Sequence, residues 1–260
     1  MAQDSRPGNY FAFNSAAARY VKGRPNFHPR IINQIQQTLQ LKQPIPRALD
    51  VGCGTGLSTL ALRPVAEQII GTDISEAMLA MAQPDPHIIY MQAPAENLPF
   101  PNEYFDFITI SLAFHWVDQP KFLTEARRLL RKGSFLVIYD NHFKGVMPGY
   151  PKFHTWFREV FLTRFPRTPR GAVHFTHEEA LQFQFELYAQ ETYPHLLTFT
   201  IDSLIAYFIS LSHVIAVIEF GGETVESIEN WLRNQLQPFF QGSAEAQCAL
   251  EAPIWCLQAV

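Results

Sequence analysis

A glycine-rich turn near residue 50 is the segment whose residue types and spacing could do chemistry. An apolar run through Asp50 is followed by glycines at positions 52, 54 and 56, and then by a stretch with helical character. Glycines lack a Cβ atom, so the backbone can turn tightly and approach a ligand beside the N-terminus of a helix. The spacing is GxGxG, and Leu57 stands where a dinucleotide fingerprint would place its third glycine. The pattern fits a ligand-binding turn or a plain tight turn, and it argues against a dehydrogenase.

An acidic residue follows the next apolar run. Asp73 closes the sequence Ile-Ile-Gly-Thr-Asp, at the end of a predicted second strand. A carboxylate in that place can accept hydrogen bonds from both hydroxyls of a ribose. It could instead cap the helix that begins near Ser75, but Ser75 is itself a good capping residue. We therefore favour the ribose role for Asp73.

Two aromatic residues, His115 and Trp116, follow the fourth predicted strand, where ligands of open α/β sheets lie. His115 could act as a general base or donate a hydrogen bond to an acceptor carboxylate, or it could simply shape the loop beside Trp116. His174 and His177 are three residues apart, but no third ligand has a recognisable spacing, so no metal site is predicted. The three cysteines form neither a CxxC pair nor an even framework, which suits a reducing compartment.

These residues need a scaffold that brings the ends of strands together. Between residues 47 and 140, short apolar runs alternate with helical segments. Such alternation implies βαβ units and a parallel sheet covered on both faces. Strands are predicted at 47–51, 68–71, 87–91, 104–110 and 135–139, and helices at 58–62, 76–82 and 121–131. Beyond residue 140 we expect helices at 152–165, 203–213 and 224–236, and strands at 185–192 and 248–260.

We expect one domain over 1–260. It comprises an N-terminal segment (1–46), a ligand-binding core (47–140), an inserted helical cap (141–185) and C-terminal sheet and helices (186–260). Of the 22 phenylalanines, 8 fall within 141–185 and only 6 within 47–140. This concentration favours an apolar-walled pocket or a dimer face in the cap, and it argues against a polyanionic ligand.

Composition excludes several classes of protein. With 47% hydrophobic residues, 17% charged residues and a net charge of -4, the chain is not disordered, and it has no basic excess for nucleic acid. No run of about 18 uncharged apolar residues exists that would span a bilayer. The polar N-terminus lacks the apolar stretch of a secretory signal, so we expect a cytoplasmic protein, a monomer or a homodimer.

Taken together, these motifs resemble a known family. The chain resembles the class I S-adenosylmethionine-dependent methyltransferases of type 11, in the group that includes the trans-aconitate and malonyl-acyl-carrier-protein methyltransferases. The residues that carry the resemblance are LDVGCGTG (49–56), GTDIS (71–75), AENLPF (95–100), YFDFITISLAFHW (104–116) and LLRKGSFLVI (129–138). Segments 13–20 and 24–29 also resemble the N-terminus of the trans-aconitate group, with His28 in place of the usual tyrosine. The resemblance implies a Rossmann-like three-layer sandwich with a seven-stranded, mostly parallel sheet that ends in an antiparallel hairpin.

The resemblance also implies a cofactor, S-adenosylmethionine, with S-adenosylhomocysteine as product and no metal. Glycines 52, 54 and 56 would lie under its methionine part, with Asp50 fixing the turn. Asp73 would bind the ribose and Ile74 the adenine ring. Pro94 replaces an acidic residue that many relatives use for the adenine amino group, so that role falls to the backbone of Ala95 and to Glu96. The remaining cofactor contacts implied are Tyr20, Arg24 and Ser111.

We therefore predict a methyltransferase that acts on an oxygen of a small molecule, a carboxylate being one candidate. His115 would be catalytic, and His115, Trp116 and Trp156 would contact the acceptor, between the glycine turn, 111–118 and the cap. A nucleobase amine is disfavoured, because 111–116 lacks the Asn-Pro-Pro-Tyr pattern. Two alternatives stay open: a carboxyl methyltransferase of a carrier-bound acyl group, or a cofactor-binding protein without activity. Carrier docking would use the basic residues Arg158, Arg164, Arg167 and Arg170.

Overall fold

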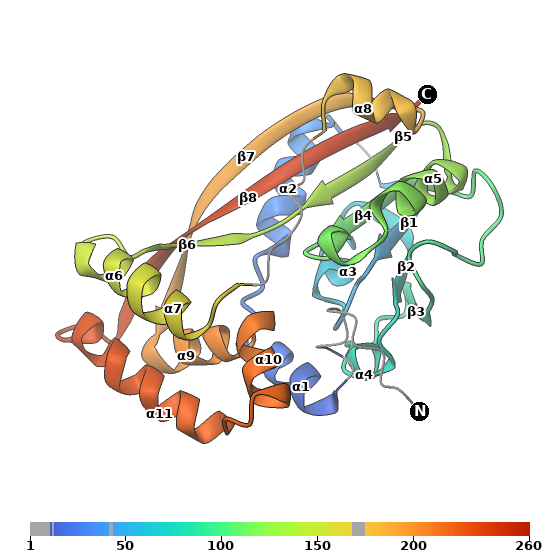
Figure 1. Cartoon of the computed structure of the whole chain (residues 1–260). Helices are drawn as coiled ribbons and strands as arrows, with labels where there is room; N and C mark the ends of the chain where they lie inside the picture. Colours follow the sequence, from blue (N-terminus) through green and yellow to red (C-terminus); the bar gives the residue numbers. More distant parts are fainter. Residues whose placement is uncertain (1–10, 12, 42–43, 168–174) are drawn as a thin grey trace. The chain divides into compact units, whose positions relative to one another are not determined.

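The computed structural model describes residue 11 and residues 13–41, 44–167 and 175–260. Within these residues the chain forms two compact units, and Figure 1 labels their elements. The first unit takes Met1–Pro25, His142–Pro169 and Pro194–Glu251, and the second takes Asn26–Asn141, Arg170–Tyr193 and Ala252–Val260. The expected cap therefore contributes 142–169 to the first unit and 170–185 to the second.

A parallel sheet forms the centre of the second unit. Strand β1 (Ile45–Val51) pairs in parallel with β2 (Ala66–Asp73) on one side and with β4 (Phe105–Ser111) on the other. Strand β3 (Ile88–Gln92) extends the sheet beyond β2, and β5 (Leu130–Tyr139) extends it beyond β4. The five strands predicted in the core are confirmed, and the order β3-β2-β1-β4-β5 brings the ends of β1, β2, β4 and β5 to one edge.

Two long C-terminal strands complete the sheet. Strand β8 (Glu245–Ala259) pairs antiparallel with β5, and β7 (Phe185–Thr200) pairs with β8. The backbone N–H of Val260 donates to the carbonyl of Gln184, which joins the start of β7 to the end of β8. The predicted C-terminal hairpin is therefore confirmed. The sheet holds eight strands in the described part of the chain, one more than predicted, because β6 (His142–Val146) also pairs with β8.

Short helices connect the strands of the second unit. Helix α5 (Gln119–Leu129) buries one apolar stripe, formed by Phe122, Leu123, Ala126 and Leu129, in the same cluster as residues of β4 and β5. It ends at Leu129, before the end of the predicted range 121–131, because Leu130 already adopts extended backbone and begins β5. The helices of this unit are α2 (His28–Thr38), α3 (Leu57–Ala61), α4 (Glu76–Leu79), η1 (Phe114–Trp116), α5 (Gln119–Leu129) and α8 (His177–Gln182).

The first unit is mainly helical. The helix predicted at 152–165 is present but carries a π-helical turn in its middle, η2 (Phe157–Phe161). The elements that were not predicted include β6, a short strand that contains Gly145, and α10 (Ser212–Phe220), whose Val- and Ile-rich sequence has no clear period. The helices of this unit are α1 (Asn14–Gly23), α6 (Pro151–Trp156), α7 (Leu162–Arg164), α9 (Ile201–Ile209), α10 (Ser212–Phe220), α11 (Val225–Leu236) and η3 (Gln237–Phe240).

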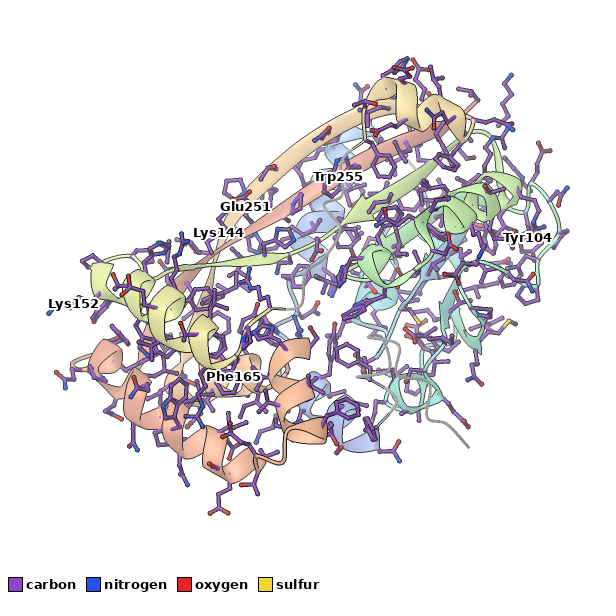
Figure 2. All side chains as sticks on the ribbon, viewed as in Figure 1. Tyr104, Lys144, Lys152, Phe165, Glu251 and Trp255 are labelled. Atoms are coloured by element: carbon purple, nitrogen blue, oxygen red, sulfur yellow. The ribbon has the colours of Figure 1, made fainter. Side chains whose placement is uncertain are left out.

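An aromatic core holds the first unit together. Phe153, Phe157, Phe161 and Phe165 are at most 3% exposed, and the rings of Phe161 and Phe208 lie 4.6 Å apart. Figure 2 shows the side chains of this unit, with Phe165 labelled. The phenylalanines of this unit thus form a buried core instead of an exposed face, and an apolar pocket wall stays a prediction.

Trp156 belongs to the same core. It is 7% exposed, and its indole Nε1 donates to Oε1 of Gln235 at 3.1 Å. These contacts account for an indole at this position without any ligand. A contact between Trp156 and an acceptor stays a prediction.

Among the described residues, no single helix is long and apolar enough to cross a bilayer. Helices α9 and α10, bent by 69° at their junction, meet the length and composition criteria only as a pair.

Candidate functional site

The carboxyl ends of adjacent parallel strands bring the predicted site residues into a row in the second unit. Asp73 ends β2, the glycine turn follows β1, and Ser111 ends β4. The register confirms this alignment, because Val51 pairs with Thr72 and with Ile110, and Ser111 pairs with Tyr139. Ligands of open α/β sheets bind at this edge. The fold therefore gathers the glycine turn, the acidic residue and the segment after β4 that the sequence singled out.

The glycine turn is packed so closely that side chains would not fit at two of its positions. Gly52 has φ +65°, and a Cβ there would lie 2.5 Å from Cβ of Ala113. Gly56 has φ +80°, and a Cβ there would lie 2.8 Å from Cζ of Tyr90 and closer still to its hydroxyl. The left-handed backbone and the close neighbours both require glycine. The tight turn that the sequence predicts is therefore explained by the left-handed backbone and the close packing of its glycines.

The carboxylate of Asp73 locks this turn to the end of β2. Its Oδ2 accepts the backbone N–H of Gly54 and its Oδ1 that of Ser75, both at 2.8 Å. Burial raises the pKa of Asp73 above its ordinary value, and these hydrogen bonds oppose the shift. The backbone N–H of Ile74 is a third hydrogen-bond donor to this carboxylate. A carboxylate offers about four acceptor positions, so the three backbone donors leave capacity for a further one. That capacity is suited to a ribose hydroxyl.

Ser75 performs the capping role that was the alternative for Asp73. Its hydroxyl accepts the backbone N–H of Met78 at the start of α4. Beside it, Ile74 is 71% exposed, while Nε2 of Gln92 donates to its carbonyl at 3.0 Å. An exposed apolar side chain next to this carboxylate is suited to a flat ring, and the adenine contact expected of Ile74 stays a prediction.

Asp50 holds the glycine turn in place through buried hydrogen bonds. It is fully buried, and its carboxylate accepts hydroxyl hydrogen bonds from Ser58 (2.6 Å), Thr59 (2.7 Å) and Thr109 (2.9 Å). These donors tie the end of β1 to the start of α3 and to β4. Burial raises the pKa of Asp50 from 3.8 to about 6, in part with the nearby charge of Asp73 and against the three hydrogen bonds. Asp50 therefore positions the loop, and a direct contact with the cofactor stays a prediction.

The raised pKa predicts a pH-dependent stability. A carboxyl whose folded pKa exceeds its unfolded one contributes stability that is fully present below about 4 and is lost as the pH rises through about 6. The loss is about 2 kcal/mol between about pH 4.5 and about pH 7. We expect Asp50→Asn to be free of this loss, as measured by urea unfolding at both values. If the wild-type chain and the variant lost the same stability between the two pH values, the assignment of the raised pKa to Asp50 would be contradicted.

The segment after β4 places His115 beside a carboxylate that the sequence analysis did not single out. Nδ1 of His115 lies 3.7 Å from Oδ2 of Asp140, which follows β5, and the histidine side chain is 5% exposed. Its ring also contacts that of Trp116, with centroids 4.8 Å apart. The hydroxyl of Ser111 is buried and has no hydrogen-bond partner among the described residues. Asp140 comes directly after β5, and Asp73 is the last residue of β2; an acidic residue at the end of an apolar run was the signal that could have identified Asp140.

The two residues expected to recognise adenine lie in the loop after β3. Oε1 of Glu96 accepts the backbone N–H of Asp118 at 2.8 Å, so this carboxylate already serves the loop that begins α5. Ala95 packs against the apolar cluster of the unit. The roles expected of both stay predictions.

Tyr20 and Arg24 lie in the first unit. Nη2 of Arg24 donates to the carbonyl of Ser210 at 3.1 Å, and its guanidinium lies over the rings of Tyr20 (4.8 Å) and Tyr207 (5.5 Å). These contacts order the side chain at the end of α1. A contact of Tyr20 and Arg24 with a cofactor stays a prediction.

The basic residues expected to dock a carrier are partly engaged within the first unit. Arg164 forms an ion pair with Glu223 and lies 4.4 Å from the ring of Trp231, and Arg167 lies over the ring of Phe157. Arg170 and His174 fall outside the described residues. Among those described, no group of three or more His, Cys, Asp or Glu side chains could hold a metal ion.

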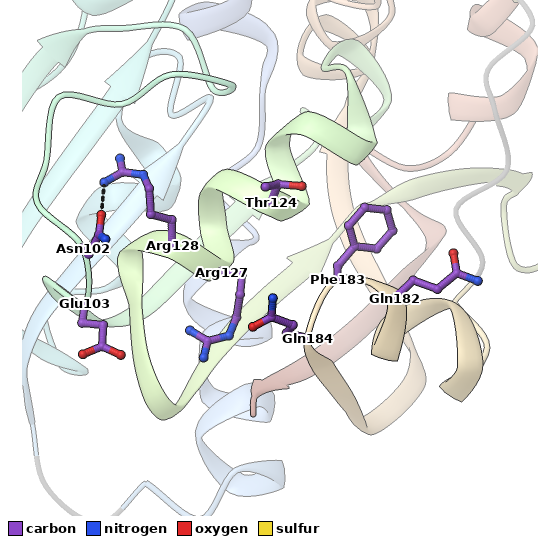
Figure 3. Close-up of a pocket in the computed structure, with 8 residues that line it drawn as sticks. All are labelled: Asn102, Glu103, Thr124, Arg127, Arg128, Gln182, Phe183 and Gln184. Carbon is purple, nitrogen blue, oxygen red and sulfur yellow. Dashed lines mark hydrogen bonds between the residues drawn. The ribbon is translucent and has the colours of Figure 1, made fainter.

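A pocket of about 670 Å³ opens at the opposite edge of the second unit's sheet (Figure 3). Its arginines are occupied: Arg127 donates to the carbonyls of Leu130 and Val260, and Arg128 donates to Oδ1 of Asn102. The lining lies before β4, before β7 and on the second half of α5, so the pocket is remote from the glycine turn. The lining residues are Asn102, Glu103, Thr124, Arg127, Arg128, Gln182, Phe183 and Gln184.

The core of the second unit is similar to a known protein family. Residues 49–138 match the family model described as "Methyltransferase domain". This segment is a class I S-adenosylmethionine-dependent methyltransferase domain. It holds the glycine turn, Asp73 and His115, while Asp140 lies just beyond it. The trans-aconitate-like subtype suggested by the sequence stays a prediction.

Individual relatives agree at the level of the domain. A Dictyostelium discoideum protein named as a methyltransferase is 29% identical over 128 residues, which cover 49% of this chain and 48% of that protein. An uncharacterized methyltransferase of Mycobacterium tuberculosis is 30% identical over 138 residues, covering 53% and 55%. The chain thus spans about half the length of these curated relatives.

Solved structures extend the likeness in fold to most of the chain. A protein titled as a type II methyltransferase from Anaeromyxobacter dehalogenans matches 87% of this chain and 94% of its own, with a TM-score of 0.65 and 24% identity. At that identity the likeness shows the fold alone. It confirms the predicted Rossmann-like architecture.

Proposed function

We propose that the chain binds S-adenosylmethionine at the carboxyl edge of β2, β1 and β4 and transfers its methyl group to an oxygen of a small molecule. The observation that carries the proposal is the carboxylate of Asp73, which fixes Gly54 at the end of β2 and keeps hydrogen-bond acceptor capacity for a ligand. The methyltransferase domain over 49–138 supports the class of reaction.

We assign residues at the carboxyl edge of the sheet to each part of the cofactor. Asp73 accepts the ribose hydroxyls, and the exposed Ile74 packs against the adenine ring. The glycine turn brings backbone close to the methionine part, where the buried hydroxyl of Ser111 has hydrogen-bonding capacity to spare. When bound, S-adenosylmethionine supplies a sulfonium methyl group that a nucleophile displaces in line. The task of the protein is then chiefly to hold the acceptor in line with that methyl group.

Two measurements test this function. Calorimetric titration with S-adenosylmethionine is expected to show binding, and mass spectrometry is expected to show S-adenosylhomocysteine release that depends on an added acceptor. The acceptor panel contains phenols, aliphatic alcohols and carboxylic acids. Absence of cofactor binding would refute the proposal. Binding without release on any acceptor would favour the alternative of a cofactor-binding protein without transferase activity.

A further inference from the structure

The loop after β4 directs His115 toward the end of β5. Leu112 adopts φ +56°, which is unusual for a residue with a side chain, and its backbone N–H donates to the carbonyl of Tyr139 at 3.1 Å. Strained backbone persists where surrounding contacts hold it, and it clusters at functional sites. The strain at Leu112 therefore gives a first reason to look for a function in this loop.

Both neighbours of His115 anchor it. Phe114 is 4% exposed and packs against Phe122 of α5, with ring centroids 5.9 Å apart. The backbone N–H of Trp116 donates to the carbonyl of Ala113 at 2.8 Å and closes the short helix η1. The imidazole is thus held in one place by the fold, as a group that acts in catalysis must be.

Asp140 is anchored as firmly as His115. Its Oδ1 accepts the backbone N–H of Asn141 at 2.7 Å, and its own N–H donates to the carbonyl of Pro253 on β8 at 3.1 Å. Oδ2, the other oxygen, is the one that faces Nδ1 of His115. A carboxylate beside Nδ1 orients the ring and stabilises the positive charge that the ring acquires when Nε2 takes a proton.

The same strand ends carry buried polar atoms that the protein does not satisfy. Oγ of Ser111 and Oδ1 of Asn141 have no hydrogen-bond partner among the described residues, although the two side chains belong to residues only 6% and 8% exposed. Buried polar groups are nearly always paired, so such atoms call for an explanation. A polar ligand at the ends of β4 and β5 would supply the missing partners.

The charge of this edge bears on the kind of acceptor. Neither 105–120 nor 134–143, which contain the ends of β4 and β5, includes a lysine or an arginine. A carboxylate acceptor would meet the negative charge of Asp140 there with no lysine or arginine from these segments to offset it. A carboxylate also carries no proton at neutral pH, so a base would have nothing to remove. A hydroxyl acceptor meets neither objection.

We propose that His115 removes the proton of an acceptor hydroxyl, with Asp140 as the residue that positions its ring, so that the substrates are phenols or other acidic hydroxyl compounds instead of carboxylates. This inference rests on the proposed function. The O–H bond breaks as Nε2 of His115 takes the proton. The oxygen forms a bond to the methyl carbon, and the C–S bond breaks with its electron pair remaining on sulfur. The products are a methyl ether, S-adenosylhomocysteine and protonated His115.

The test compares para-substituted phenols of graded acidity with the matching benzoic acids. We expect methylation of phenols and not of benzoic acids. His115→Ala is expected to lower kcat about 100-fold or more with 4-methylphenol, and much less with 4-nitrophenol, which is already largely ionised in mild alkali. Asp140→Asn is expected to lower kcat about tenfold or more and to change KM little. His177→Ala and Asp202→Asn, both on exposed side chains, serve as matched controls without effect.

Distinct results would overturn the inference. Methylation of benzoic acids but not phenols would refute the substrate class. An equal loss with both phenols in His115→Ala, or a lost affinity for S-adenosylmethionine, would assign His115 a binding or structural role. Absence of turnover with either series would instead refute the proposed function, and with it this inference.

Discussion

Asp73→Ala is expected to weaken the binding of S-adenosylmethionine by about 100-fold or more. The remaining acceptor capacity of this carboxylate would receive charge-assisted hydrogen bonds from the ribose, each contributing about 1.5–3 kcal/mol. A loss of about 3 kcal/mol corresponds to about 100-fold in affinity. The variant also removes the acceptors for the N–H groups of Gly54 and Ser75, which shape the turn. Calorimetric titration measures the effect directly.

Asp85 provides a matched control for that experiment. Its Oδ1 accepts the backbone N–H two residues ahead, on His87, at 2.8 Å, as Oδ1 of Asp73 does for Ser75. It lies before β3, away from the glycine turn. We expect Asp85→Ala to bind the cofactor with unchanged affinity. Equal affinities for Asp73→Ala and the unmodified chain would refute the ribose assignment.

Gly56→Ala is expected to destabilise the fold by about 2–5 kcal/mol and to weaken cofactor binding more than tenfold. Left-handed backbone costs about 1–2 kcal/mol for a residue with a Cβ. Overpacking adds about 1–3 kcal/mol. The ring of Tyr90 cannot move aside freely, because it also lies against Gly71, where a Cβ would be 2.9 Å from its Cδ1. Urea unfolding and calorimetry measure the two effects.

Gly133 separates the backbone term from the packing term. Its φ is +79°, against +80° for Gly56, and a Cβ there would meet nothing within 4 Å. Gly133→Ala is therefore expected to cost only about 1–2 kcal/mol and to leave cofactor affinity unchanged. In a Tyr90→Ala background, Gly56→Ala should cost no more than Gly133→Ala. Equal costs in the unmodified chain would show that contact with Tyr90 does not restrict position 56.

The cofactor edge could be predicted from sequence because its signals are local. Glycines at 52, 54 and 56 follow an apolar run, and Asp73 ends the next one, so strand, turn and carboxylate are all visible within 25 residues. The parallel sheet then follows from the alternation of strands and helices. Five core strands were predicted in this way, whereas the final hairpin was expected from the resemblance to the methyltransferase family.

The pairing of His115 with Asp140 could not be predicted, because it depends on strand order. The two residues are 25 positions apart in the chain, and they meet only because β5 lies beside β4. The packing of the phenylalanines of 141–185 could not be predicted for a different reason. Composition shows that a segment is aromatic, but only packing shows that Phe153 and Phe161 are fully buried.

A crystal structure with bound S-adenosylhomocysteine tests the central claim most directly. We expect both ribose hydroxyls within hydrogen-bond distance of the Asp73 carboxylate, the adenine ring against Ile74, and the amino-acid part over the glycine turn. Binding of the ligand elsewhere, for example in the pocket beside Arg127 and Gln184, would contradict the assignment of the carboxyl edge as the cofactor site.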